Sequence, residues 1–111
     1  MSEARAVVLG GGAVGLAFAA AAAAKGMPVR VLESGPSRPA ADPDLYDARV
    51  FALSPGTRDF LEAIGAWRRI PADRIAEVLR MDVRGDDGAS RLDFEPPAGR
   101  PLSWIVEGNR L

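Results

Sequence analysis

The chain has 111 residues, a formal net charge of −1 at pH 7, and neither cysteine nor histidine. This length allows one domain at most, and the composition excludes disulfides, thiolate metal sites and imidazole base catalysis by the chain's own side chains. The nearly neutral charge provides no electrostatic basis for binding nucleic acid or an anionic membrane. Chemistry supplied by a bound cofactor therefore fits this composition best.

The first third of the chain predicts a strand, a helix and a second strand. Residues 4–9 are apolar except for Arg5, as in a buried parallel strand. Residues 13–25 are rich in alanine, which favours a helix, and this helix is expected to end at Lys25 and Gly26. Residues 28–33 predict the second strand, which ends in an acid. This order is typical of a βαβ unit with parallel strands.

Three glycines between the first strand and the helix indicate the ligand of this unit. Gly10, Gly12 and Gly15 have the G-x-G-x-x-G spacing of dinucleotide-binding proteins. Gly10 permits the tight turn, Gly12 leaves room for a pyrophosphate, and Gly15 lets the helix lie close to the strand. The anion would lie against the N–H groups at the helix start, those of Ala13 and Val14 included. The segment therefore predicts a dinucleotide site.

The acid at the end of the second strand completes this pattern. Glu33 is placed to accept hydrogen bonds from ribose hydroxyls, and its charge disfavours a 2′-phosphate, so NADP is not expected at this site. Three alternatives stay open: Glu33 as a solvated strand-end acid, residues 5–24 as a secretory signal, and a strand–helix unit without a ligand. Three successive glycines argue against the signal because they interrupt its apolar core.

A loop and a second helix follow. Residues 34–47 are rich in Pro, Gly and Asp and predict a surface loop beyond the carboxyl end of the strand, where ligands bind in open α/β sheets. Residues 49–54 lead into a helix with Ser54 as its N-cap and Pro55 as its first residue, and Gly65 is expected to break it. The apolar stripe that predicts the buried face of this helix comprises Phe60, Leu61, Ile64 and Trp67.

An antiparallel hairpin is predicted next. Residues 75–84 are predicted as one strand, whose mainly apolar face also carries Glu77 and whose charged face also carries Val78. The charged face is expected to be solvated. The turn at residues 86–88 reverses the chain, and residues 90–95 return with Leu92 and Phe94 facing inward.

The last predicted elements show that the nucleotide unit is incomplete. Residues 102–106 predict a short strand, and Glu107 is expected to start another helix. Only residues 4–9 and 28–33 are readable as parallel strands, whereas a doubly wound nucleotide domain needs at least a third. The chain is therefore expected to be the front part of a longer protein.

Three segments narrow the family. Residues 47–55, which read DARVFALSP, and residues 64–67, which read IGAW, resemble the N-terminal part of the ubiquinone-biosynthesis flavin hydroxylases. These enzymes are relatives of para-hydroxybenzoate hydroxylase, the class A aromatic monooxygenases. Residues 104–109, WIVEGN, resemble that family's IVEN stretch with Gly108 inserted. The resemblance covers the whole chain in order.

The resemblance implies an oxidoreductase that binds FAD, takes electrons from NADH or NADPH and transfers one oxygen atom to a phenolic ring. It implies no catalytic side chain and no metal ligand in this segment. For Arg49, the residues alone leave a solvated side chain, or an ion pair with Asp44 or Asp47, as the alternative. Carried over by position, the cofactor residues are Gly10, Gly12, Ala13, Val14 and Gly15 at the pyrophosphate, Glu33 at the ribose, Arg49 along the cofactor and Asn109 near the ribityl chain.

The expected fold class is α/β, with a Rossmann-like βαβ FAD-binding unit and an appended antiparallel β-hairpin, incomplete relative to the full family fold. Residues 1–70 would form the βαβ dinucleotide unit and a helix, and residues 71–111 the first strands of the substrate domain. The family's second flavin sequence, a Gly-Asp pair, normally lies far downstream of the part compared here. We therefore expect this chain alone to be inactive and to retain FAD weakly.

Two other functions remain as alternatives: a non-catalytic nucleotide-binding module that self-associates, and another FAD or NAD oxidoreductase. The exposed edge of an incomplete sheet invites pairing with a second chain, so a homodimer is expected. Besides FAD, the expected partner is a phenolic small molecule in the complete enzyme, and nucleic acid is not expected. The expected location is the cytoplasm, with peripheral membrane contact in the complete enzyme.

Overall fold

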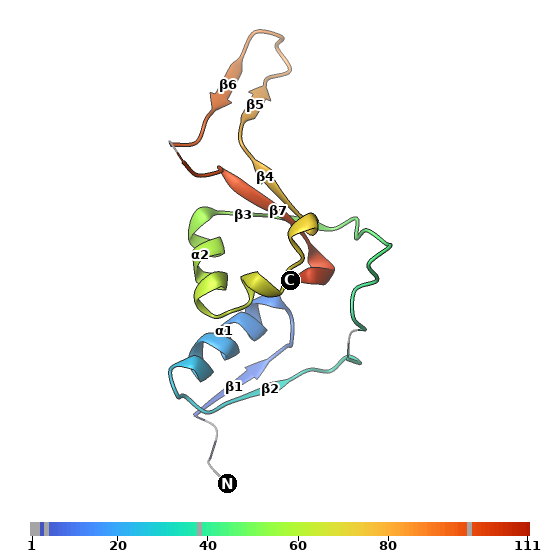
Figure 1. The fold of residues 1–111 in the computed structure, drawn as a ribbon, viewed down its shortest axis with the longest axis vertical. Helices are drawn as coiled ribbons and strands as arrows, with labels where there is room; N and C mark the ends of the chain where they lie inside the picture. Colours follow the sequence, from blue (N-terminus) through green and yellow to red (C-terminus); the bar gives the residue numbers. More distant parts are fainter. Residues whose placement is uncertain (1–2, 4, 38, 98) are drawn as a thin grey trace.

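The computed structural model describes residues 3, 5–37, 39–97 and 99–111, and its shape is elongated. Its principal extents are 63 × 31 × 28 Å and its radius of gyration is 17.7 Å, against about 13 Å for a compact domain of this length. Figure 1 shows three parts along the long axis: a parallel βαβ unit, a central antiparallel sheet with a helix, and a protruding hairpin. The predicted mixture of helices and strands is confirmed, and the parallel sheet has two strands within the described residues.

The βαβ unit consists of β1 (Ala6–Leu9), α1 (Ala13–Ala24) and β2 (Val29–Leu32). The two strands pair in parallel, and α1 packs on one face of the pair. The elements predicted from the sequence are therefore present: β1 ends and α1 begins as predicted, α1 ends one residue earlier, and β2 is one residue shorter at each end. The predicted start of the first strand, residue 4, lies outside the described residues. The expected burial of the first strand is wrong for every second residue: Val7 is exposed, and Leu9 is 81% exposed. Within the described residues nothing covers the face opposite α1.

The central sheet joins strands from distant parts of the sequence. Its order is β3 (Val50–Leu53), β7 (Ser103–Glu107) and β4 (Ile75–Val78), all antiparallel. The strand predicted for residues 102–106 therefore lies between two others, shifted by one residue. Glu107 ends this strand and is the N-cap of the helical segment predicted there, which is a single 3-10 turn, η3 (Gly108–Arg110).

The helix α2 (Pro55–Ala63) covers one face of the central sheet and completes the main core. Its N-terminus is capped as predicted, since the backbone N–H of Thr57 donates to the Ser54 hydroxyl at 3.2 Å. Gly65, with a φ of +78°, ends the helical segment in a conformation that glycine adopts readily. The buried core comprises Leu53, Leu61, Ile70 and Val106, with Ile64, Ala66, Trp67, Ile75 and Leu111 packed against it. Trp67 belongs to a 3-10 turn, η1 (Trp67–Arg69), and not to α2 itself.

The hairpin differs from the expectation of one long strand. After a second 3-10 turn, η2 (Ala72–Arg74), the chain runs through β4, leaves the central sheet, and continues as β5 (Met81–Arg84), which pairs with β6 (Arg91–Phe94). The prediction that Leu92 and Phe94 face inward is wrong, because they are 61% and 46% exposed. The physical reason is that the hairpin projects away from the core (Figure 1), so neither of its faces is covered by described residues.

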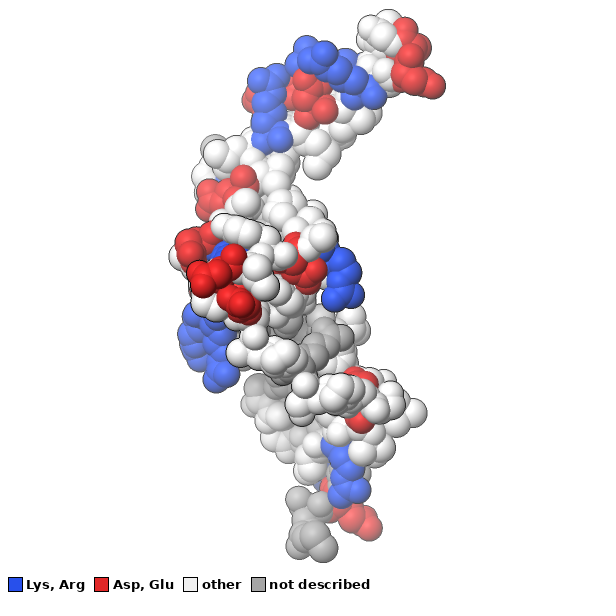
Figure 2. Space-filling view, turned by 90° about the vertical axis from the view of Figure 1, so that its right-hand side faces the viewer, with Lys and Arg blue, Asp and Glu red and all other residues white. Residues whose placement is uncertain are grey.

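Ion pairs connect the charged side chains of β5, β6 and the residue before β5. Arg91 lies 3.0 Å from Asp82, Arg84 lies 3.2 Å from the same carboxylate, and Arg80 pairs with Asp93. Figure 2 shows these basic and acidic groups side by side at the top of the molecule. These ion pairs are exposed, so this face of the hairpin is solvated. No described helix is long and apolar enough to cross a membrane.

Candidate cofactor-binding site

The glycine turn between β1 and α1 has the geometry that its spacing predicts. Gly10 has a φ of +104°, and its backbone N–H donates to the Leu32 carbonyl at 2.7 Å, so the turn begins where the parallel pairing ends. Gly12 is the N-cap of α1, and its carbonyl accepts from the N–H of Leu16 at 2.9 Å. No described side chain caps this helix and its first turn carries no acid. Its first N–H groups are therefore suited to an anion.

The space around Gly12 and Gly15 shows that these two glycines are needed for different reasons. A Cβ at Gly15 would lie 2.2 Å from the Gly10 carbonyl oxygen and 3.1 Å from Cγ1 of Val8, so only glycine permits this approach of helix to strand. A Cβ at Gly12 would meet nothing within 4 Å. The protein thus leaves open space above the turn, as a ligand there requires, while Gly15 is needed by the protein's own packing.

Glu33 is tied to the glycine turn, which the sequence did not predict. Its carboxylate accepts the backbone N–H of Gly11 at 2.5 Å and that of Gly35 at 3.1 Å. A carboxylate has about four acceptor positions on its two oxygens, so a single group of this kind can accept from several donors at once. A shallow hollow of about 330 Å³ lies at the carboxyl ends of the two parallel strands, lined by Leu9, Gly10, Leu32, Glu33 and Ser34.

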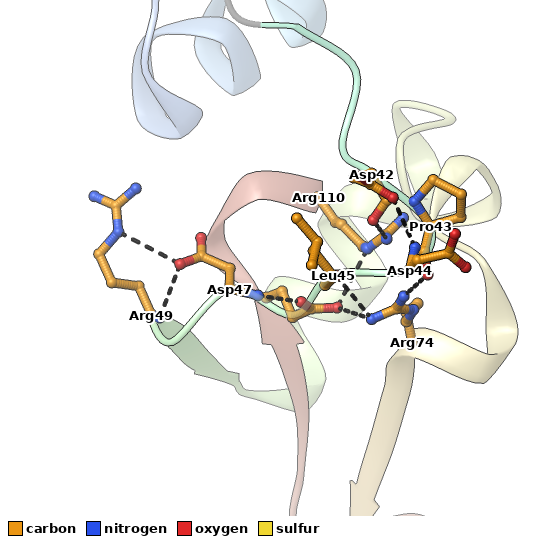
Figure 3. Close-up of polar contacts among 9 residues, drawn as sticks. Asp42, Pro43, Asp44, Leu45, Asp47, Arg49, Arg74 and Arg110 are labelled. Carbon is orange, nitrogen blue, oxygen red and sulfur yellow. Dashed lines mark hydrogen bonds and ion pairs between the residues drawn. The ribbon is translucent and has the colours of Figure 1, made fainter.

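Arg49 and Asn109, sixty residues apart in the sequence, line a second hollow of about 560 Å³. The Arg49 side chain is 76% exposed, and its Nε lies 3.9 Å from Oδ1 of Asp47. The ion pair with Asp47, left open by the sequence, is therefore present without burying the guanidinium. Figure 3 shows Arg49 extending away from the other charged groups. The other residues that line this hollow are Pro39, Ala40, Ala41, Asp42, Leu45, Tyr46 and Asp47.

Gly108 connects the segment that contains Asn109 with the backbone of Arg49. Its backbone N–H donates to the Arg49 carbonyl at 2.7 Å. A Cβ at this position would lie 3.1 Å from Cε2 of Phe51 and 3.4 Å from the Arg49 carbonyl oxygen. The glycine inserted in the WIVEGN segment therefore occupies a crowded position against the start of β3, and it places Asn109 beside Arg49.

Glu107 is the residue near this hollow that the sequence did not identify. It is buried, and its carboxylate accepts the backbone N–H of Asp47 at 2.6 Å, Nη1 of Arg74 at 3.1 Å and Nε of Arg110 at 3.2 Å. The N–H of Asp47 above all, with the charges of both arginines, lowers the pKa of Glu107 against the opposing effect of burial. In the sequence, Glu107 stands out only as an acid directly after an apolar strand. That position does not reveal which residues its carboxylate binds.

The same two arginines hold the loop that walls the second hollow. Arg74 donates to the Leu45 carbonyl at 3.3 Å and to the Pro43 carbonyl, and its guanidinium lies 4.0 Å from the centre of the Tyr46 ring. Arg110 donates to the Asp42 carbonyl at 3.1 Å. Figure 3 shows the side chains of Arg74 and Arg110 pointing toward the loop that contains Asp42, Pro43 and Leu45.

The tryptophans pack in the protein core, as their spacing favoured. The ring centres of Trp67 and Trp104 are 6.0 Å apart at an angle of 79°, and Trp104 is buried. The Arg58 guanidinium lies 5.3 Å from the first ring centre and 5.8 Å from the second, within cation–π distance. The prediction that Phe60 lies on the buried face of α2 is wrong, because its side chain is 41% exposed, whereas Leu61 on the same helix is buried. Among the residues that the structure describes, no cluster of acids could hold a metal ion.

These elements define a mixed α/β protein in which a glycine turn and a strand-end acid form an open site on a parallel βαβ unit. Comparison with curated proteins identifies the family. The chain is 32% identical over 111 residues to the ubiquinone hydroxylase UbiM of Neisseria meningitidis serogroup C, a match that covers 95% of this chain and 24% of that protein. It is thus homologous to the ubiquinone-biosynthesis hydroxylases, and the resemblance predicted from its sequence is confirmed.

Two further relatives support the same family. The ubiquinone biosynthesis monooxygenase COQ6 of Xenopus tropicalis is 32% identical over 108 residues, with 93% of this chain and 23% of that protein covered. Its counterpart in Caenorhabditis elegans is 30% identical over 112 residues, with 95% and 25% covered. The chain therefore spans about a quarter of the length of the curated relatives it matches. No family model matches the chain.

Proposed function

We propose that this chain is the FAD-binding part of a flavin-dependent aromatic monooxygenase that acts on a phenolic precursor of a quinone. The observation that carries the proposal is the pair of hollows. One lies at Gly10 and Glu33 beside the uncapped start of α1, and the other is lined by Arg49 and Asn109. The names of the relatives supply the reaction class, hydroxylation or monooxygenation in ubiquinone biosynthesis.

Each predicted residue has a role in this proposal that its surroundings support. The N–H groups of Gly12, Ala13 and Val14 would bind the pyrophosphate, because the space above this turn is open and the helix dipole favours an anion there. Glu33 would accept hydrogen bonds from the adenosine ribose, and Gly15 keeps α1 close enough to β1 for this geometry.

The second hollow would receive the flavin half of the cofactor. Arg49 has an exposed guanidinium able to bind a phosphate oxygen, and Asn109 can both donate to and accept from the ribityl hydroxyls. The bound FAD would supply the redox chemistry with NADH or NADPH as the reductant. The residues of this chain would bind and orient the cofactor, and none of them needs to exchange a proton with the substrate.

The open form of both hollows supports a further part of the proposal, that this segment alone does not turn over substrate. Activated oxygen must be shielded from water during transfer to a ring, and neither hollow is enclosed by described residues. FAD is therefore expected to bind reversibly and to dissociate during gel filtration. A stoichiometric flavin absorbance in the purified chain would contradict this weak retention.

The decisive experiment is a titration of the 111-residue chain with FAD, followed by flavin fluorescence. The matched pair of variants is Gly15→Ala, where a Cβ would collide with the Gly10 carbonyl, and Gly56→Ala on α2, where a Cβ meets nothing within 4 Å. The native chain and Gly56→Ala should bind equally, and Gly15→Ala should bind FAD at least about tenfold more weakly. Equal binding by all three, or binding by none, would overturn the proposal.

Self-association is a second candidate function, which the exposed apolar side chains favour. Leu9 and Val14 in the βαβ unit are 81% and 85% exposed, and a two-stranded sheet has open edges. Light scattering across a wide range of protein concentrations separates the two functions. A stable dimer that binds no FAD would favour the self-associating module, and a monomer that binds FAD would exclude it.

A further inference from the structure

We propose that Glu107 is a positioning residue, whose buried carboxylate holds Arg49 and Asn109 in place for the flavin half of the cofactor. This inference rests on the proposed FAD site and deepens it. Glu107 itself does not line the hollow of Arg49 and Asn109; it is buried and bonded to Asp47, which does line it. Its effect on a ligand would therefore be transmitted by the segments that it holds.

The first of these segments is the loop that precedes β3. The N–H of Asp47 donates to Oε2 of Glu107 at 2.6 Å. Oδ1 of Asp47 in turn accepts the backbone N–H of Arg49 at 3.0 Å and lies 3.9 Å from Nε of the same residue. A chain of two hydrogen bonds thus connects Glu107 with the backbone of Arg49, and the ion pair with Asp47 adds a weaker link to the Arg49 side chain.

The second segment is η3, which carries Asn109. It begins directly after Glu107, and its first residue, Gly108, donates to the Arg49 carbonyl at 2.7 Å. Its last residue, Arg110, turns back and donates from Nε to Oε1 of Glu107 at 3.2 Å. Asn109 is therefore held between one residue fixed to Arg49 and another fixed to Glu107.

A carboxylate is needed at position 107 because it balances the charges of two buried arginines. The side chains of Glu107, Arg74 and Arg110 are exposed by only 8%, 6% and 9%. A neutral side chain at position 107 would leave two guanidiniums close together with no counter-ion between them, which is costly for buried charges. Because the same guanidiniums bind the carbonyls of Asp42 and Leu45, their displacement would also move the wall of the hollow.

The experiment compares two nucleotide probes, FAD and ADP, in the native chain and in Glu107→Gln. ADP carries only the half of the cofactor assigned to Glu33 and the glycine turn, so it reports on folding and on the first hollow. We expect Glu107→Gln to weaken FAD binding about tenfold and to change ADP binding by less than about twofold. The control is Glu62→Gln, which removes an exposed ion pair with Arg58 and should leave both affinities unchanged.

The outcomes distinguish this inference from the proposed function. If the native chain binds neither probe, the proposed function fails and the inference with it. If the native chain binds both probes and Glu107→Gln loses both equally, or loses neither, the positioning role alone is overturned. A general loss of folding cannot imitate the expected result, because it would weaken ADP binding as well.

A second variant keeps the test decisive should Glu107→Gln not fold. Arg110→Gln keeps the bonds of Glu107 to Asp47 and Arg74 and removes the bond from Nε. It should lower the ratio of FAD affinity to ADP affinity by about threefold and speed hydrogen exchange at the N–H of Gly108. An unchanged ratio with unchanged exchange would overturn the inference.

Discussion

The βαβ unit and the central sheet use their apolar residues in opposite ways. In the central sheet, β3, β7 and α2 bury Leu53, Leu61 and Val106, and Val106 is completely inaccessible to solvent. In the βαβ unit, Ala22 is the buried apolar residue within the described part, while Val14 and Leu9 are largely exposed. The stability of the molecule is therefore concentrated in one region, and the most recognisable site sequence in the other.

This difference shows that a binding turn and a packed core can come from separate parts of one chain. The geometry of the glycine turn is set by local contacts among β1, α1 and β2, so it forms without a large core. The second hollow depends on the central sheet, because β7 brings Glu107 and Asn109 to the loop before β3. If FAD binds across both hollows, as we propose, the cofactor would connect the two regions.

The largest expected effect comes from breaking the core of the central sheet. Leu61→Ala should lower the free energy of unfolding by about 2–5 kcal/mol, because it leaves a cavity among well-packed neighbours. Urea unfolding followed by tryptophan fluorescence measures this change, since Trp67 packs against the same core. Phe18→Ala in α1 is the comparison, and as Phe18 is 51% exposed it should cost clearly less. Equal losses would contradict the contrast between the regions.

The next effect tests the βαβ unit by overpacking. Gly15→Ala should destabilise this unit by about 1–3 kcal/mol, because the new methyl group forces α1 away from the Gly10 carbonyl. Hydrogen exchange at the amides of β1 and β2 is the measurement, and the amides of β7 should not change. Gly56→Ala, in open space on α2, should stabilise the chain by about 0.5–1 kcal/mol. Faster exchange in β7 would show that the two regions unfold together.

A smaller effect is expected at the cap of α2. Ser54→Ala should cost about 1 kcal/mol, because the N–H of Thr57 loses its acceptor. Ser54→Asp should restore most of this loss, since aspartate accepts the same hydrogen bond at an N-cap. Thermal unfolding of the three chains checks the order. If Ser54→Asp were no more stable than Ser54→Ala, the hydrogen bond would not be the source of the stabilisation.

The smallest effect is a local dependence on pH in the hairpin turn. The hydroxyl of Ser90, followed by the backbone N–H groups of Ser90 and Ala89, lowers the pKa of Asp87 to about 2. The stabilisation of the turn is therefore complete above the unfolded pKa of about 3.9 and is lost as the pH falls toward about 2. The amide resonances of Ala89 and Ser90 should shift over this pH range, and Asp87→Asn should abolish the pH-dependent shift. A titration midpoint at about pH 3.9 would contradict the lowered pKa of Asp87.

Local rules predicted much of the βαβ unit and of α2 correctly. The glycine spacing predicted the turn at Gly10 and the close approach of helix and strand at Gly15. The start of α2 at the Ser54 cap and the end of the helical segment at Gly65 were also predicted correctly. The resemblance to the ubiquinone-biosynthesis hydroxylases was also recognisable from the sequence, and the 32% identity to UbiM over 95% of this chain confirms it. These features depend on residues a few positions apart, so the sequence by itself determined them.

Only the tertiary structure decided which distant segments meet. The sequence predicts one strand over residues 75–84, yet β4 and β5 pair with different strands, β7 and β6, and the choice of these partners depends on the arrangement of segments outside residues 75–84. Glu107 became the centre of a charge network through partners up to sixty residues away. Burial followed the same rule: the apolar residues of β1 and β6 were predicted to be covered, but exposure depends on what packs above a strand, which the strand's own sequence does not specify.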